Sequence, residues 1–107
     1  MSQDKLKRLL KELKSGLAAL YGSRLCGVYL FGSYARNDHD EESDIDIMIV
    51  LSDYEYYGEE LDRSSELVSR LSLKYGVSIS TIFQRQQEWL EADTPLLRNV
   101  RVEAIPV

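Results

Sequence analysis

Cysteine, proline and basic charge are all scarce in this sequence. The 107 residues include a single cysteine, Cys26, and two prolines. One cysteine cannot form an internal disulfide, which excludes the small disulfide-stapled folds and fits a reducing compartment. Because Cys26 lies in an apolar run, we expect it to be a buried, small hydrophobic side chain.

Basic residues are outnumbered by acidic ones. The 13 lysines and arginines stand against 18 aspartates and glutamates, which gives a net charge of −5. Such a chain has no broad basic surface for a phosphate backbone, so we do not expect a nucleic acid partner. The sequence also lacks a long apolar run and the apolar core of a signal peptide. No membrane attachment is therefore expected, and the predicted location is cytoplasmic.

The composition that remains is that of a folded domain. Hydrophobic residues make up 44% of the chain and charged residues 29%, which is typical of globular proteins and not of disordered ones. A chain of this length has room for one core. We expect a single domain over residues 1–107.

Leucine spacing predicts two long helices. Apolar residues recur at helical intervals over residues 6–20, and Gly22 follows as a stop signal. A second helix is expected to fill the interval from Ser52 to Tyr75, with Ser52 and Glu55 in the spacing of a capping box.

An apolar, β-prone run that ends at Gly32 and two alternating segments predict three strands. They cover residues 25–31, 44–51 and 77–83, and a short helix is expected over 86–91. The last residues, 96–107, also alternate, but a proline near their end limits any strand there to an edge or a stub. This order of elements predicts an α/β fold in which helices cover one face of a sheet or both.

Two aspartates open the second predicted strand. Side chains two apart on a strand point the same way, so Asp44 and Asp46 project from one face. Their like charges repel, and a hard cation such as Mg²⁺ would offset that repulsion. The plain alternative is an exposed edge strand with its polar side in water. Against it, residues 47–50 are apolar on both faces, as in a central strand, whose acidic end would lie where open α/β sheets hold ligands.

A glycine and a serine follow the first predicted strand. Gly32 would let the backbone approach a phosphate closely, and Ser33 would offer its hydroxyl and backbone N–H groups to an anion. Taken alone, the pair is equally typical of a strand-to-helix turn capped by Ser33. Beside an aspartate pair on the neighbouring strand, it describes a site for a nucleoside triphosphate with Mg²⁺.

Both motifs together resemble the signature of a known superfamily. Residues 30–36 read LFGSYAR, and residues 43–47 read SDIDI, with ten residues between the Gly-Ser pair and the first aspartate. This resembles the Gly-Ser, ten residues, Asp-x-Asp pattern of the DNA polymerase β-like nucleotidyltransferases, and more narrowly the minimal nucleotidyltransferases (MNT or MntA-like proteins) of bacteria and archaea. The resemblance implies a nucleotidyltransferase fold of the α/β (α+β) kind, a small mixed β-sheet with helices packed on it.

The same resemblance implies a function. Two Mg²⁺ ions would bind the triphosphate of ATP, with Asp44 and Asp46 as catalytic metal ligands. Gly32 and Ser33 would hold the β and γ phosphates, and Arg36 would assist there. Members of this family transfer AMP to a hydroxyl of a separately encoded HEPN-type toxin, for which they act as antitoxin. The chain is expected to lack a second domain that could supply an acceptor, which favours such a partner over a small-molecule substrate and is also compatible with a homodimer.

One departure from the family pattern leaves an alternative open. Active members bring a third carboxylate from a later strand, where this chain has Ser78 and Ser80. Another acid such as Asp53 or Glu55 would have to take that place, or water would fill it. Otherwise the chain would be a catalytically impaired, nucleotidyltransferase-like binding module that inhibits or scaffolds its partner by contact alone.

Overall fold

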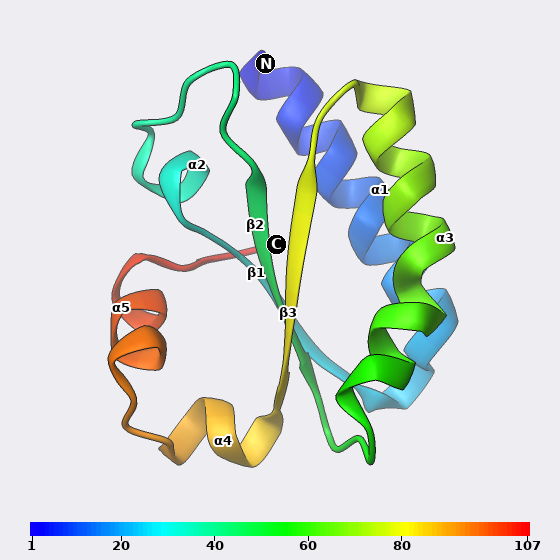
Figure 1. Ribbon diagram of the computed structural model, residues 1–107, viewed down its shortest axis with the longest axis vertical. Helices are drawn as coiled ribbons and strands as arrows, with labels where there is room; N and C mark the ends of the chain where they lie inside the picture. Colours follow the sequence, from blue (N-terminus) through cyan, green and yellow to red (C-terminus); the bar gives the residue numbers. More distant parts are fainter.

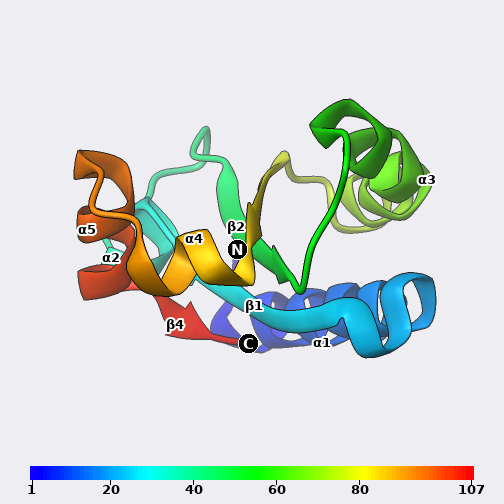
Figure 2. The same cartoon turned by 90° about the horizontal axis from the view of Figure 1, so that it is seen from below.

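The computed structural model describes residues 1–107 as a sheet between two layers of helices (Figure 1). The elements are α1 (Gln3–Tyr21), a 3-10 turn (Gly22–Arg24), β1 (Leu25–Phe31), α2 (Ser33–Arg36), β2 (Ile45–Leu51), α3 (Tyr57–Tyr75), β3 (Ile79–Arg85), α4 (Gln86–Glu91), α5 (Pro95–Glu103) and β4 (Ile105–Pro106). Helices α1 and α3 cover one face of the sheet, and α4 and α5 cover the other (Figure 2). None of the helices combines the length and the apolar composition that crossing a membrane requires.

Strand β2 lies at the centre of the sheet, whose order is β3-β2-β1-β4. It runs antiparallel to β1 and parallel to β3, and β4 joins β1 antiparallel. A parallel pair needs a crossover connection, which α3 supplies. The predicted α/β class and the mixed sheet are confirmed. In this register Asp46 lies between Phe31 of β1 and Ser80 of β3.

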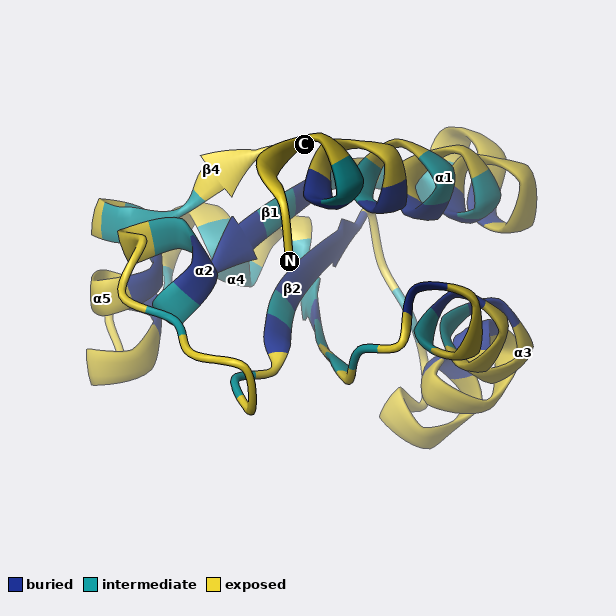
Figure 3. Ribbon diagram, turned by 90° about the horizontal axis from the view of Figure 1, so that it is seen from above, coloured by how far each residue is buried: buried dark blue, intermediate teal, exposed yellow.

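Each face of β2 packs into its own apolar cluster. The larger cluster joins α1, α3 and the isoleucine face of the strand, with residues Leu9, Leu13, Leu17, Ile45, Ile47, Ile49, Leu67, Leu71 and Phe83 among its members. The smaller one joins the opposite face to α5 and consists of Phe31, Met48, Val50, Leu97 and Val100. Figure 3 shows β2 buried and the outer sides of α1 and α3 exposed. The central position predicted for this strand is therefore confirmed.

Helix α3 and strand β3 both begin later than predicted. Helix α3 begins at Tyr57, not near Ser52, because the Ser52 N–H donates to the Arg24 carbonyl (2.8 Å) and so prolongs the sheet. No side chain caps that helix. Strand β3 begins at Ile79, not at Val77, because the Val77 N–H donates to the Ser72 carbonyl (3.0 Å) and closes the end of α3.

The tail forms helix α5, although the alternation of its apolar residues did not predict a helix. Thr94 caps α5 by accepting a hydrogen bond from the Leu97 N–H (3.2 Å), and Pro95 starts the helix. Leu97 and Val100, three residues apart, are buried against the sheet. The short edge strand predicted at the end of the tail is confirmed as β4.

Cys26 is exposed, which contradicts the expected burial. Strand β4 covers β1 only at Tyr29 and Leu30, so the first half of β1 is an open edge. The register of β1 also shifts between Leu25 and Gly27. An apolar run on an edge strand does not bury every residue in it.

We predict that Leu13→Ala lowers the free energy of unfolding by about 2–5 kcal/mol, because it opens a cavity at a residue with no exposed surface. The matched control is Leu73→Ala on α3, a leucine that is 85% exposed. Urea unfolding followed by circular dichroism measures both variants. Equal losses in the two would contradict the described core.

Candidate functional site

The two predicted aspartates lie at the start of the central strand. Asp44 directly precedes β2 and is exposed, and Asp46 is half-buried on the face that packs toward α5. Ser80 lies next to Asp46 on the neighbouring parallel strand. The Asp46 carboxylate receives no hydrogen bond from the protein, so no donor within the chain compensates its burial directly.

The electrostatics at Asp46 oppose its charge. Burial raises the pKa of the Asp46 carboxyl, and the negative charge of Asp44 raises it further. Arg36 lowers this pKa, while Glu103 raises it. The net effect is a raised pKa, so the charged carboxylate is less stable here than in water. A cation beside Asp46 would stabilise the charged form.

The backbone of Gly32 passes close to this carboxylate. Its φ of +75° and ψ of −156° lie in a region that glycine alone adopts readily. A Cβ atom at this position would lie 2.2 Å from Oδ2 of Asp46. Position 32 therefore requires glycine for two reasons: its backbone angles and the closeness of Asp46.

Ser33 and Arg36 lie on the single helical turn that follows. Gly32 is the N-cap of α2, so Ser33 is the first residue of the helix and not its cap. Arg36, at the end of the same turn, donates to Asp38 (3.1 Å) and to Glu103 (3.0 Å). The short helix therefore presents a serine hydroxyl and a guanidinium on the side of Asp46.

Glu103 is a site residue that the sequence analysis missed. One carboxylate oxygen accepts a hydrogen bond from the Gly32 N–H (3.0 Å), and the other accepts from Arg36 (3.0 Å). The signal that could have found it is the spacing of Leu97, Val100 and Glu103, which repeats every three residues along one helical face. Reading the tail as an alternating segment hid that face.

These residues surround one pocket of about 590 Å³ between α2 and α5. Its lining comprises Phe31, Gly32, Ser33, Arg36 and Asp46 near the motif strands, and Leu96, Asn99, Val100, Val102 and Glu103 from α5. The structure thus brings together four of the five predicted site residues. The fifth, Asp44, is adjacent in sequence to β2 but does not line the pocket.

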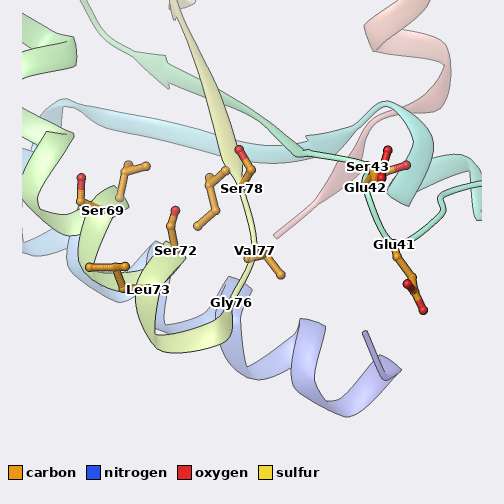
Figure 4. A pocket seen from close by; sticks show the side chains of 11 residues that line it. Glu41, Glu42, Ser43, Ser69, Ser72, Leu73, Gly76, Val77 and Ser78 are labelled. Atoms are coloured by element: carbon orange, nitrogen blue, oxygen red, sulfur yellow. The ribbon is translucent and has the colours of Figure 1, made fainter.

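A larger hollow of about 800 Å³ lies elsewhere, and Ser43 is the one residue of the two motifs that lines it. Figure 4 shows Ser69, Ser72 and Leu73 of α3 with Ser78 on one side, and Glu41, Glu42 and Ser43 on the other. Ile79, which also lines it, packs with the cluster beneath α1 and α3. This hollow has neither a cationic side chain nor either aspartate of the pair, so it does not compete as the phosphate site.

No third carboxylate completes the aspartate pair. Asp53 forms an ion pair with Arg85 (3.0 Å), at the opposite end of β2 and β3, and Glu55 lines a pocket with both. The hypothesis that Asp53 or Glu55 takes the third place is therefore wrong. The chain has no group of three or more acids, histidines or cysteines arranged to hold a metal ion.

The donor set still fits a hard cation that keeps other ligands. Mg²⁺ is often bound through one or two carboxylates, with water and substrate phosphates completing its octahedral shell. Asp46 near the start of β2 and Asp44 directly before the strand supply two carboxylates, and Asp46 lines a pocket with a guanidinium for an anion. The arrangement suits a cation that arrives with a phosphate ligand.

Comparison with known proteins agrees with this chemistry. The sequence model of the family described as "Nucleotidyltransferase domain" matches residues 4–106. A relative from Methanocaldococcus jannaschii, named "Putative protein adenylyltransferase MJ0604", is 41% identical over 81 residues, which cover 76% of this chain and 75% of the relative.

Solved structures share the fold. The "Structure of putative minimal nucleotidyltransferase" has a TM-score of 0.69 at 23% identity and covers 100% of this chain and 97% of that chain. The "Crystal structure of the toxin-antitoxin with AMP-PNP" has a TM-score of 0.61 at 22% identity and covers 99% and 72%. The predicted nucleotidyltransferase fold is confirmed.

We predict that Gly32→Ala destabilises the chain by more than the matched change Gly22→Ala. Both glycines have positive φ angles with extended ψ, but a Cβ at Gly22 meets nothing within 4 Å. Gly22→Ala should cost about 1–3 kcal/mol from backbone strain alone. Gly32→Ala should cost more, because the methyl group also displaces Asp46.

A double-mutant cycle isolates that second contribution. In an Asp46→Ala background the excess cost of Gly32→Ala should disappear, since the clashing oxygen is gone. Urea unfolding of the four chains measures the coupling. Additive effects would show that Asp46 and Gly32 are not in contact.

Proposed function

The chain belongs to the nucleotidyltransferase domain family and is an enzyme of that class, and from this premise we propose that it transfers AMP from ATP to a hydroxyl group of a partner protein. The observation that carries the proposal is the meeting of Gly32, Ser33 and Arg36 with Asp46 around one pocket. The relative named as a protein adenylyltransferase supports AMP as the group and protein as the acceptor.

Gly32, Ser33 and Arg36 would bind the phosphates. The backbone at Gly32 carries no side chain, so phosphate oxygens could approach its N–H group closely. Arg36 is positioned to form paired, charge-assisted hydrogen bonds with an oxyanion, and the hydroxyl of Ser33 adds a donor on the same helical turn. Together these donors would hold the β and γ phosphates and stabilise charge on the leaving pyrophosphate.

Asp44 and Asp46 would hold Mg²⁺, with two ions expected. Bound there, Mg²⁺ would lower the pKa of the acceptor hydroxyl and offset the charge that builds on the triphosphate. The aspartates would orient the ions, because Asp46 lies on β2 and Asp44 directly precedes it, and the strand is buried beyond them. The fixed spacing of that strand sets where the reacting phosphate would lie.

We propose a HEPN-type toxin as the partner and an antitoxin role for this chain. A similar fold occurs in a toxin-antitoxin crystal structure with AMP-PNP, which supports both a toxin partner and an adenine nucleotide. Two exposed apolar residues of α5, Leu96 and Val102, lie at the pocket. They offer a contact surface for the protein that brings its hydroxyl to the nucleotide.

A contact-only antitoxin is the second candidate. Ser80 lies beside Asp46 where a third carboxylate would support the acceptor, and no other acid replaces it. A hydroxyl is a weaker Mg²⁺ ligand than a carboxylate. On this reading the chain binds its partner, and the nucleotide pocket contributes little to inhibition.

We predict that the wild-type chain binds ATP only weakly without Mg²⁺ and more tightly with it. Asp44→Asn and Asp46→Asn should each weaken Mg²⁺-ATP binding by about tenfold or more, equal to about 1.4 kcal/mol. Without Mg²⁺ the same changes should strengthen ATP binding, because they remove a charge that repels the triphosphate. Isothermal titration calorimetry measures both conditions.

The control for this titration is Asp62→Asn, an exposed acid on α3 that changes the net charge equally. It should leave both dissociation constants unchanged. If the Asp44 and Asp46 variants lose the same affinity with and without Mg²⁺, these residues do not hold the metal.

We predict that labelled AMP from Mg²⁺-ATP appears on a co-expressed HEPN-type partner and is absent with the Asp44→Asn, Asp46→Asn double variant. Loss of label together with loss of toxin inhibition, while the complex still forms, supports the transfer. Inhibition that persists without label supports the contact-only function. Pull-down of the partner provides the measure of complex formation.

A further inference from the structure

The carboxylate of Glu103 occupies the donors that the proposed function assigns to phosphate. Its two oxygens accept from the Gly32 N–H and from the Arg36 guanidinium, each at 3.0 Å. The side chain is 21% exposed, so it is largely withdrawn from water. An oxyanion is thus already bound in the pocket, and it belongs to the chain itself.

This carboxylate and a phosphate group cannot use these donors together. Arginine binds either oxyanion through the same planar fork, and the single N–H of Gly32 serves one strong acceptor. A phosphate that entered beside Glu103 would also stand close to the negative charge of Asp46. A phosphate can therefore take the Gly32 N–H, and the Arg36 N–H that Glu103 holds, only if Glu103 leaves them.

The position of Glu103 in its helix is unfavourable without these contacts. It is the last residue of α5, where the helix dipole presents its negative end and basic side chains are preferred. The hydrogen bonds to Gly32 and Arg36 offset that cost. The Glu103 carboxylate is therefore stabilised by the Gly32 N–H and the Arg36 guanidinium, and not by the dipole of its own helix.

We infer that Glu103 is an internal stand-in for phosphate, which orders Gly32 and Arg36 in the free chain and is displaced when the triphosphate enters. This inference rests on the proposed function, because it assumes that the pocket takes a nucleotide. Leu97 and Val100 anchor α5 to the sheet, so displacement needs only the last turn of the helix to change. Nucleotide binding is thereby coupled to the segment that leads into β4.

The exchange has a measurable consequence for affinity. A chain whose binding-competent state is only partly populated binds its ligand more weakly by that fraction. Glu103→Ala removes the competing carboxylate and should tighten Mg²⁺-ATP binding by about tenfold. Glu103→Gln keeps an acceptor for Gly32 but loses the charge that Arg36 binds, so its gain should be smaller.

The experiment titrates the wild type and both variants with Mg²⁺-ATP, and separately with inorganic triphosphate, by calorimetry. Glu91→Gln, an exposed acid on α4, controls for the change in net charge and should behave as the wild type. Arg36→Ala combined with Glu103→Ala tests the route: with the guanidinium absent, removal of Glu103 should improve affinity much less. Urea unfolding of each variant confirms that it is folded.

The outcomes separate the stand-in role of Glu103 from the proposed nucleotide site. Equal ATP affinity in wild type and Glu103→Ala, or weaker binding in the variant, overturns the stand-in role and leaves the proposed function intact. Tighter binding of triphosphate by Glu103→Ala, with no ATP binding by any chain, supports the stand-in role and overturns the nucleotide site. Binding of neither ligand by any folded variant overturns both.

Discussion

Gly32 leaves β1 with a positive φ angle, and its backbone passes so close to Asp46 that no larger residue fits between them. This contact joins the turn that carries Gly32, Ser33 and Arg36 to the start of the strand that carries Asp46. The remaining features of the fold serve to keep that approach in place.

Strand β2 provides the rigidity for the approach. Its isoleucine face packs against α1 and α3, and its other face packs against α5. A strand buried on both sides cannot slide in register without moving apolar residues into the wrong layer. The repulsion between Asp44 and Asp46 is therefore tolerated at its start, because the apolar packing beyond them holds the strand in place.

Positive charge is scarce around the pocket. The chain is acidic overall, and the pocket has one guanidinium, that of Arg36. In the free chain that cation is shared between Asp38 and Glu103, both of which are acids of the chain. A nucleotide with Mg²⁺ would compensate both kinds of charge, because the metal would lie at the aspartates and the phosphates at Arg36. Mg²⁺ alone or the nucleotide alone would compensate only one of them.

Local patterns in the sequence were sufficient for the strands, for the two faces of β2 and for the residues of the Gly-Ser and Asp-x-Asp motifs, because side-chain direction on a strand depends only on a period of two residues. Tertiary structure alone decided that α5 covers the pocket and that Glu103 reaches Gly32 and Arg36. It also decided that Asp53 lies at the wrong end of the sheet. These outcomes depend on strand register and on contacts between residues far apart in the chain, which no local period encodes.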